Sequence, residues 1–149
     1  LFLKKHKMSI DQAAKFYETY VGKWGQESIT YRFEAIKNGD VVDEQVVGAT
    51  YGSLLRVTQD DLVLSESETY EVTRVVVEHV NNNGNPLMYS NEVITVDVEG
   101  PLELIGPKHL TLIGGSIGFY VKTIGETGLT NITISSHNLE TVEIQIEVK

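Results

Sequence analysis

The sequence predicts a mainly β protein, an immunoglobulin-like β-sandwich preceded by an N-terminal helix and a β-hairpin. The first indication is residues 70–80, a segment rich in β-branched residues that stops at the Asn-rich turn of residues 82–86. The second is the final segment, residues 141–148, in which apolar and polar residues alternate almost perfectly. The third is that no strand–helix–strand period appears, so a parallel sheet is not expected.

A helix is predicted near the N-terminus. Ser9 and Gln12 have the spacing of a capping box, and Asp11 is well placed for the helix dipole. Apolar residues then recur at helical spacing and form one stripe, which consists of Ala13, Tyr17, Tyr20, Val21 and Trp24. Gly22 and Gly25 are expected to end the helix. We expect the stripe to be buried against a sheet or a neighbouring domain rather than to serve as a sugar platform.

A β-hairpin is predicted over residues 28–48. Apolar and polar residues alternate over 29–36, which indicates a half-buried strand, and Asn38-Gly39 is a strong hairpin signal. Residues 41–47 supply the returning strand. A two-stranded hairpin is not stable alone. It is therefore expected either to pad the sandwich or to belong to a domain that lies mostly upstream.

Short strands follow one another at regular intervals from about Gly52 onwards. The predicted strands are 54–57, 62–64, 69–80, 92–98, 102–104, 110–112, 117–123, 129–135 and 141–148. Turn clusters rich in Gly, Pro, Asn and Asp separate them, and this spacing is typical of an immunoglobulin-like sandwich. We divide the chain into residues 1–50, a linker or the remnant of a preceding domain, and residues 51–149, the sandwich.

Composition excludes several classes of function. The net charge of −9 argues against nucleic-acid binding, and the absence of Cys excludes disulfides and zinc–thiolate sites. No apolar segment approaches the ~20 residues that span a bilayer, so no membrane insertion is expected. The N-terminus lacks the order of a secretory signal and begins without Met, which suggests a piece of a longer protein. A cytoplasmic location is slightly favoured, with the bacterial cell surface or secretion as alternatives.

Several motifs together resemble a known family. They are residues 75–80, 83–86, 96–101, 104–106 and 114–123, followed by Gly125 and Gly128. This pattern resembles the immunoglobulin-like C-terminal domain of bacterial family-2 glycoside hydrolases, mainly β-galactosidases. Residues 20–25 and 31–39 are similar to the piece that precedes that domain. The similarity covers roughly residues 9 to 148 and rests on turn glycines and strand patterns.

The resemblance implies an accessory role. The chain would brace the catalytic core, shape the active-site entrance or contribute to subunit contacts, and the parent protein would be the glycosidase. Its partners would then be other domains of the same parent chain, with a homo-oligomer possible in the parent. A second similarity, to bacterial surface repeats of the invasin and intimin type, leaves an adhesion or spacer repeat as an alternative. In the Asp-x-x-Gly-Asn turn of those repeats, Asn81 or Asn82 stands here at the acidic position.

No catalytic, cofactor-binding or metal-binding residue is assigned, and no cofactor is expected. The resemblance places the two catalytic glutamates of family-2 hydrolases in a (β/α)₈ barrel, which this chain cannot contain. The pairs Glu66 with Glu68 and Asp60 with Asp61 are interpreted as surface charge. They could also be imagined as a calcium site, but the spacing of a calcium loop is absent.

Neither a nucleophile nor a histidine ligand set is predicted. Residues 114–118 match the Gly-x-Ser-x-Gly pattern, but a β-segment follows where a nucleophile elbow needs a helix, so we interpret them as a glycine-rich turn. The four histidines have no ligand-type spacing. We expect His79 to point to solvent or to a domain interface.

A carbohydrate-binding module is a further alternative, because aromatic rings stack on the faces of sugars. Phe119 and Tyr120 are adjacent, so on a strand one of them must face outward. Tyr89 is expected in a loop with Met88 and Asn91. The candidate sugar or domain contacts are Tyr89, Tyr120 and Trp24.

Overall fold

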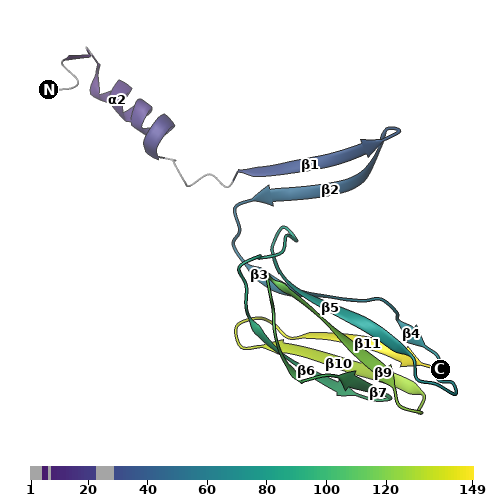
Figure 1. The fold of residues 1–149 in the computed structure, drawn as a ribbon. Coiled ribbons are helices and arrows are strands. Elements are labelled where there is room, and N and C mark those ends of the chain that lie inside the picture. Colours follow the sequence, from purple (N-terminus) through teal and green to yellow (C-terminus); the bar gives the residue numbers. More distant parts are fainter. Residues whose placement is uncertain (1–4, 7, 23–28) are drawn as a thin grey trace. The chain divides into compact units, whose positions relative to one another are not determined.

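The computed structural model describes residues 5–6, 8–22 and 29–149 (Figure 1). The chain divides into two compact units, residues 1–49 and 50–149. Strands make up most of the described structure, and one short α-helix of eight residues lies near the N-terminus. The mainly β sandwich with an N-terminal helix and hairpin is therefore confirmed. The interpretation of residues 1–50 as a linker or domain remnant stays a prediction.

The predicted helix forms, but its apolar stripe is exposed. Helix α2, Ile10–Tyr17, continues into the π-helical turn η1, Glu18–Gly22. The capping box is confirmed, because Gln12 N donates to Ser9 Oγ at 3.1 Å and Ser9 N donates to Gln12 Oε1 at 3.0 Å. Tyr17 and Tyr20 are 63% and 69% exposed, so the expected burial is wrong for these residues. The remaining aromatic of the stripe, Trp24, lies outside the described residues.

The reason for this error is physical. An amphipathic pattern shows that a helix needs a partner surface, but it does not show whether that surface belongs to the same chain. Here α2 contains no buried residue, and the rings of Phe16 and Tyr20 stack on each other at 5.8 Å between their centroids. None of the described helices has the length and apolar character needed to cross a membrane.

The hairpin forms with the predicted turn. Strands β1, Thr30–Lys37, and β2, Asp40–Gly48, pair antiparallel. Asn38 and Gly39 adopt φ angles of 56° and 95°, as a two-residue turn with two left-handed positions requires. Tyr31 and Phe33 lie on one face and are 58% and 59% exposed, so the half-buried strand expected here is wrong. As with the helix, the alternation of apolar and polar residues indicates that the strand has an apolar face. It does not indicate which surface covers that face.

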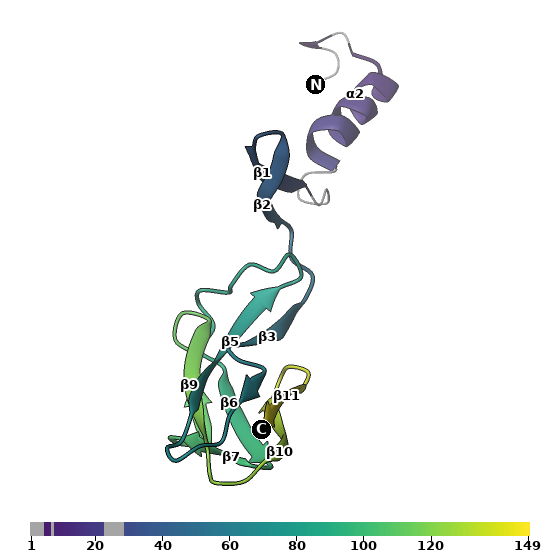
Figure 2. The ribbon, with the colours of Figure 1, turned by 90° about the vertical axis from the view of Figure 1, so that its right-hand side faces the viewer.

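The second unit is a sandwich of two sheets (Figures 1 and 2). One sheet has the order β4-β11-β10-β6-β8 and the other has the order β3-β5-β9-β7. The strands are β3 Ser53–Gln59, β4 Val63–Leu64, β5 Val72–Asn81, β6 Val93–Glu99, β7 Leu102–Ile105, β8 His109–Thr111, β9 Ser116–Thr123, β10 Gly128–Ser136 and β11 Val142–Val148. Each predicted strand is present, although β5 begins at Val72 instead of residue 69.

The strands pair antiparallel, except that the short β4 pairs parallel with β11. Inward side chains of both sheets form the core, because every second residue of a strand faces the opposite sheet. Its fully buried members include Val75, Val77, Ile94, Val96, Val121, Ile132, Ile134 and Ile146. These residues come from β5, β6, β9, β10 and β11, so the centres of both sheets are fastened together by apolar contacts.

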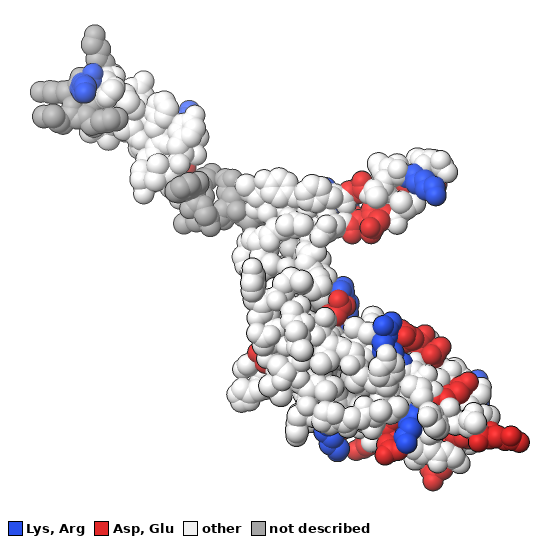
Figure 3. Space-filling model, in the orientation of Figure 1, with Lys and Arg blue, Asp and Glu red and all other residues white. Residues whose placement is uncertain are grey.

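Charged side chains of both signs are interspersed on the outer surface of the sandwich (Figure 3). Arg56 Nη2 lies 2.8 Å from Glu78 Oε2, and Arg74 Nε lies 3.1 Å from Asp60 Oδ2. The hydrogen bond from Arg74 to Asp60, and then the charge of Asp60, raise the pKa of the guanidinium. Ion pairs that are exposed, as Arg74–Asp60 is, or only partly buried, as Arg56–Glu78 is, contribute little to stability, so the core is the main source of the free energy of unfolding.

One polar group inside the core leads to a prediction about stability. Thr130 is fully buried, and its Oγ1 has no hydrogen-bond partner among the described residues. A buried hydroxyl without a partner is costly, so Thr130→Val should raise the free energy of unfolding by about 1 kcal/mol. Urea unfolding followed by circular dichroism measures this change.

The matched control is Thr73→Val. Thr73 is equally buried, but its Oγ1 donates to Asp61 Oδ2 at 2.9 Å and accepts from Asp61 N at 3.2 Å. Because this hydroxyl has its partners, Thr73→Val should lower stability by about 1–2 kcal/mol. A loss of stability in Thr130→Val as large as that in Thr73→Val would contradict the interpretation.

Candidate functional site

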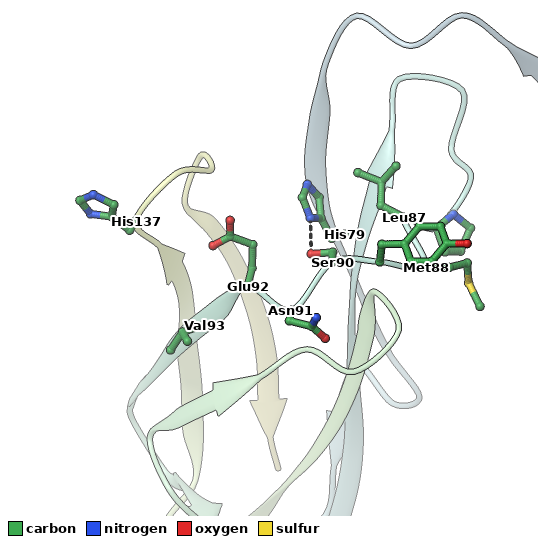
Figure 4. A pocket seen from close by; sticks show the side chains of 10 residues that line it. His79, Leu87, Met88, Ser90, Asn91, Glu92, Val93 and His137 are labelled. Atoms are coloured by element: carbon green, nitrogen blue, oxygen red, sulfur yellow. Dashed lines mark hydrogen bonds between the residues drawn. The ribbon is translucent and has the colours of Figure 1, made fainter.

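A hollow of about 960 Å³ opens on the sandwich unit beside the loop that joins β5 to β6. Figure 4 shows Glu92 and His137 on one side of it, Leu87 and Met88 on the other, and Asn91 between them. Most of these residues belong to the β5–β6 loop, whereas His137 comes from the loop between β10 and β11. Two segments far apart in the sequence therefore share one concave surface.

The Asn-rich turn folds the β5–β6 loop back toward its own strand. Asn81 Oδ1 accepts hydrogen bonds from the backbone N–H groups of Asn83 at 2.9 Å and Asn85 at 3.1 Å. Gly84 takes the left-handed φ of 80° that the turn needs. Leu87 N then donates to His79 O at 2.8 Å. Asn81 thus supplies the side-chain acceptor that Asp supplies in the Asp-x-x-Gly-Asn turn of the surface repeats. The turn therefore closes with Asn at this position.

His79 is buried beneath this loop, so the expectation that it faces solvent or a domain interface is wrong. It is 8% exposed, with Nδ1 at 2.7 Å from Ser90 Oγ and Nε2 at 2.8 Å from Ser53 Oγ. The returning loop covers the imidazole, and two hydroxyls satisfy both ring nitrogens. This bridge fastens the loop to β3.

The contact between Ser90 and His79 has the reach of a nucleophile–base pair. In a catalytic arrangement of that kind a third group orients the base, and in many such sites it is a carboxylate. Here the third group is the hydroxyl of Ser53. The geometry suits a structural bridge, in which each hydroxyl supplies a hydrogen bond that a buried imidazole needs.

The glycine-rich segment after β8 packs against the backbone of the β5–β6 loop. Gly114 and Gly115 form a turn and Ser116 begins β9, so the interpretation of this segment as a β-turn is confirmed. Gly115 N donates to Ser90 O at 3.0 Å. Gly115 has a φ of 82°, and a Cβ there would lie 2.5 Å from Leu87 O. Only glycine allows the two backbones to approach this closely.

The loop exposes large side chains although its backbone is held. The side chains of Tyr89 and Met88 are 98% and 67% exposed, so neither contributes to the core. Across the hollow, Glu92 Oε2 accepts from Ser136 Oγ at 3.2 Å and Glu92 Oε1 accepts from Asn138 Nδ2 at 3.1 Å. The carboxylate is therefore positioned by the β10–β11 loop while it remains at the surface of the hollow.

Of the candidate residues from the sequence, Tyr89 and Tyr120 do not line the same site. Tyr89 lines the hollow, but Tyr120 is not among its lining residues, and Trp24 lies outside the described part of the chain. Phe119 is 4% and Tyr120 49% exposed, which confirms that one of this pair faces outward. A role for these aromatics as sugar or domain contacts stays a prediction.

Three of the acidic residues singled out in the sequence, Asp60, Asp61 and Glu66, serve turns and an ion pair. Asp60 binds Arg74, Asp61 accepts from Thr73, and Glu66 Oε2 accepts from Gly125 N at 3.0 Å. Over the ranges that the structure covers, no three His, Asp or Glu side chains are grouped so that they could hold a metal ion.

The chain is similar in sequence to β-galactosidases, of which it covers very different shares. A β-galactosidase of Thermoanaerobacterium thermosulfurigenes is 35% identical over 98 residues, which are 64% of this chain and 13% of that enzyme. A β-galactosidase sequence from Rhizobium radiobacter is 26% identical over 128 residues, which are 85% of this chain and 92% of that sequence. No protein-family model matches the chain.

Solved structures share the fold. A β-glycosidase of Bacteroides vulgatus superposes with a TM-score of 0.67 and 20% identity, over 82% of this chain and 18% of that one. The D00-D0 domain of intimin superposes with a TM-score of 0.55 and 9% identity, over 84% of this chain and 67% of that one. These structural likenesses show the sandwich fold. A family-2 glycosyl hydrolase of Bacteroides cellulosilyticus superposes with a TM-score of 0.66 and 14% identity, over 83% of this chain and 18% of that one. The glycosidase structures and the sequence relatives together confirm the predicted resemblance to a small part of family-2 glycosidases.

Proposed function

We propose that this chain is a non-catalytic accessory region of a bacterial family-2 glycoside hydrolase, a β-galactosidase, and that it braces the catalytic core or the subunit contacts. The observation that carries the proposal is the 35% identity to a β-galactosidase of which the chain spans only 13%. A segment of that size is too small to hold a (β/α)₈ barrel, which typically needs about 250 residues. The catalytic carboxylates of the parent would therefore reside elsewhere.

Exposed apolar faces on the first unit support a bracing role. On the hairpin, Tyr31 pairs with Val47 across the strands, and Phe33 lies on the same face; all three side chains are exposed. On the helix, Phe16 and Tyr20 are exposed as well. Contiguous exposed apolar surface commonly marks an interaction site, because its burial is favourable by ~25 cal/mol per Å².

The partners in this proposal are other domains of the same parent chain, with a homo-oligomer of the parent as the second possibility. The net charge of −9 disfavours nucleic acid as a partner.

The proposal predicts that the purified 149-residue chain has no glycosidase activity. Hydrolysis of p-nitrophenyl-β-galactoside should not exceed that of a mock preparation, because the two carboxylates about 5 Å apart that a retaining mechanism requires would lie in another domain. A matched preparation in which Glu92 is replaced by Gln serves as a control. Turnover above that of the mock preparation would contradict the accessory role, and its loss in the Glu92→Gln variant would locate it at the hollow.

The reading frame upstream of Leu1 provides the second test. It should continue into a (β/α)₈ barrel with two catalytic glutamates. Repeated copies of the sandwich, or a stop codon, would favour the adhesion or spacer alternative and would overturn the proposal.

A further inference from the structure

We propose that the hollow beside Tyr89 binds a neutral oligosaccharide, which gives the sandwich unit a binding function beyond bracing. The first support is Tyr89 itself. Its side chain is 98% exposed, although tyrosine usually buries much of its ring. An aromatic ring that the core does not use is free to stack on the apolar face of a sugar, and Met88 beside it extends the apolar surface.

The second support is that the loop is organised before a ligand arrives. Pro86 restricts the backbone φ angle ahead of the exposed residues of the loop. Leu87 N donates to His79 O at 2.8 Å, and Ser90 N donates to Leu87 O at 2.8 Å. Residue Ser90 is held further by the His79 side chain at 2.7 Å and by Gly115 N at 3.0 Å. Tyr89 lies between these fixed points. Binding would therefore cost little backbone ordering, and preorganisation of this kind favours affinity.

The third support is the set of polar side chains that line the hollow opposite its apolar side (Figure 4). The side chains of Asn91, Glu92 and His137 line the hollow and contain both hydrogen-bond donors and acceptors. Glu92 is oriented by Ser136 and Asn138, and each carboxylate oxygen keeps a free lone pair. The apolar side chains of Tyr89 and Met88 next to an amide and an oriented carboxylate match a sugar ring, which has apolar faces and hydroxyls at its edge.

The charge of the site selects among sugars. The carboxylate of Glu92 attracts hydroxyl donors and repels a uronate, and the whole chain has a net charge of −9. Neutral sugars are therefore preferred to acidic ones. With a volume of about 960 Å³, the open hollow has room for several sugar rings, so the ligand is an oligosaccharide instead of a single sugar. The choice of galactosides as the first probe rests on the proposed function.

The test is titration of the full ¹⁵N-labelled chain with β-1,4-galactotetraose, followed through its amide resonances. The expected result is saturable binding with a Kd on the order of 1 mM or tighter, with the largest shifts at residues 88–92 and 137. Tyr89→Ala should weaken binding by at least about tenfold, which corresponds to the stacking of one ring. Tyr89→Phe keeps the ring and should stay close to the parent chain. Tetragalacturonate should bind at least about tenfold more weakly than galactotetraose.

The matched control is Tyr70→Ala. Tyr70 is an exposed tyrosine of the same unit and is not among the residues that line the hollow, so its removal should leave binding unchanged. Unfolding in urea should show that both alanine variants remain folded, because both rings are exposed. Three results would overturn the proposal: no binding of galactotetraose, cellotetraose or xylotetraose at 10 times the expected Kd, binding that Tyr89→Ala leaves intact, or shifts away from the hollow. None of them affects the reading-frame test, so the two proposals fail separately.

Discussion

Replacement of Ile132 by Ala should lower the free energy of unfolding of the sandwich unit by about 3–4 kcal/mol. Ile132 is fully buried on β10, where it lies between Ile144 of β11 and Val98 of β6. The change removes three methyl or methylene groups and leaves a cavity between two sheets that cannot close fully around it. Because such a domain is stable by only about 5–15 kcal/mol, this single change removes a large share of the total.

Urea unfolding followed by circular dichroism of the β signal measures the effect. The midpoint should fall by roughly 1–4 M, with an unchanged slope. Two controls separate burial from strand propensity. Ile132→Val removes one group and should cost about 1 kcal/mol. Leu129→Ala lies on the same strand but is 53% exposed, so it should cost less than about 1 kcal/mol. Equal losses at Leu129 and Ile132 would contradict the assignment of Ile132 to the core.

The sandwich could be predicted from sequence because its signals are local. Alternation with a period of two places Val142, Ile144, Ile146 and Val148 on one side of β11, and two of them, Ile146 and Val148, are buried. The turn at Asn38-Gly39 is equally local, since each residue accepts the left-handed φ that the turn demands. In both cases neighbouring residues contain all of the information needed.

The predictions of burial were wrong where burial depends on a contact with residues distant in the sequence. The periodicity of the helix and of β1 correctly marks an apolar side, yet Tyr17, Tyr20 and Phe33 are exposed, because periodicity does not identify the partner surface. His79 was misplaced although the period of two puts it on the same face of β5 as Val75 and Val77, which are buried. What the alternation does not show is the loop that covers the imidazole, which the side chain of Asn81 and the close approach of Gly115 hold in place.

The candidate site was foreseen only in part. The loop position of Tyr89, with Met88 and Asn91, follows from the dense turn signal before it, whereas its exposure is known only from the structure. Ser90, Glu92 and His137 were missed, since their relation depends on how the β10–β11 loop meets the β5–β6 loop. A weak signal was available in Ser136 and Asn138, which are polar residues of a turn cluster and able to hydrogen-bond to a neighbouring loop.

The second large effect concerns the support of that loop. Gly115→Ala should destabilise the chain by about 2–5 kcal/mol, because two penalties add. The left-handed φ of 82° costs a residue with a Cβ about 1–2 kcal/mol, and the new Cβ would lie 2.5 Å from Leu87 O, which forces the backbone to move at a cost of about 1–3 kcal/mol. Urea unfolding measures the total.

Gly125→Ala separates the two penalties. Gly125 has nearly the same φ, 88°, but no atom lies within 4 Å of its added Cβ, so this variant should lose only the conformational part, about 1–2 kcal/mol. The difference between the variants is the cost of pushing the β5–β6 loop away from the Gly114-Gly115 turn. Since Gly115 N also bonds Ser90 O, the shifted loop should change the amide resonances of residues 87–91 in Gly115→Ala alone. Equal destabilisation by both variants, with resonances 87–91 unmoved, would mean that the close backbone approach does not position Tyr89.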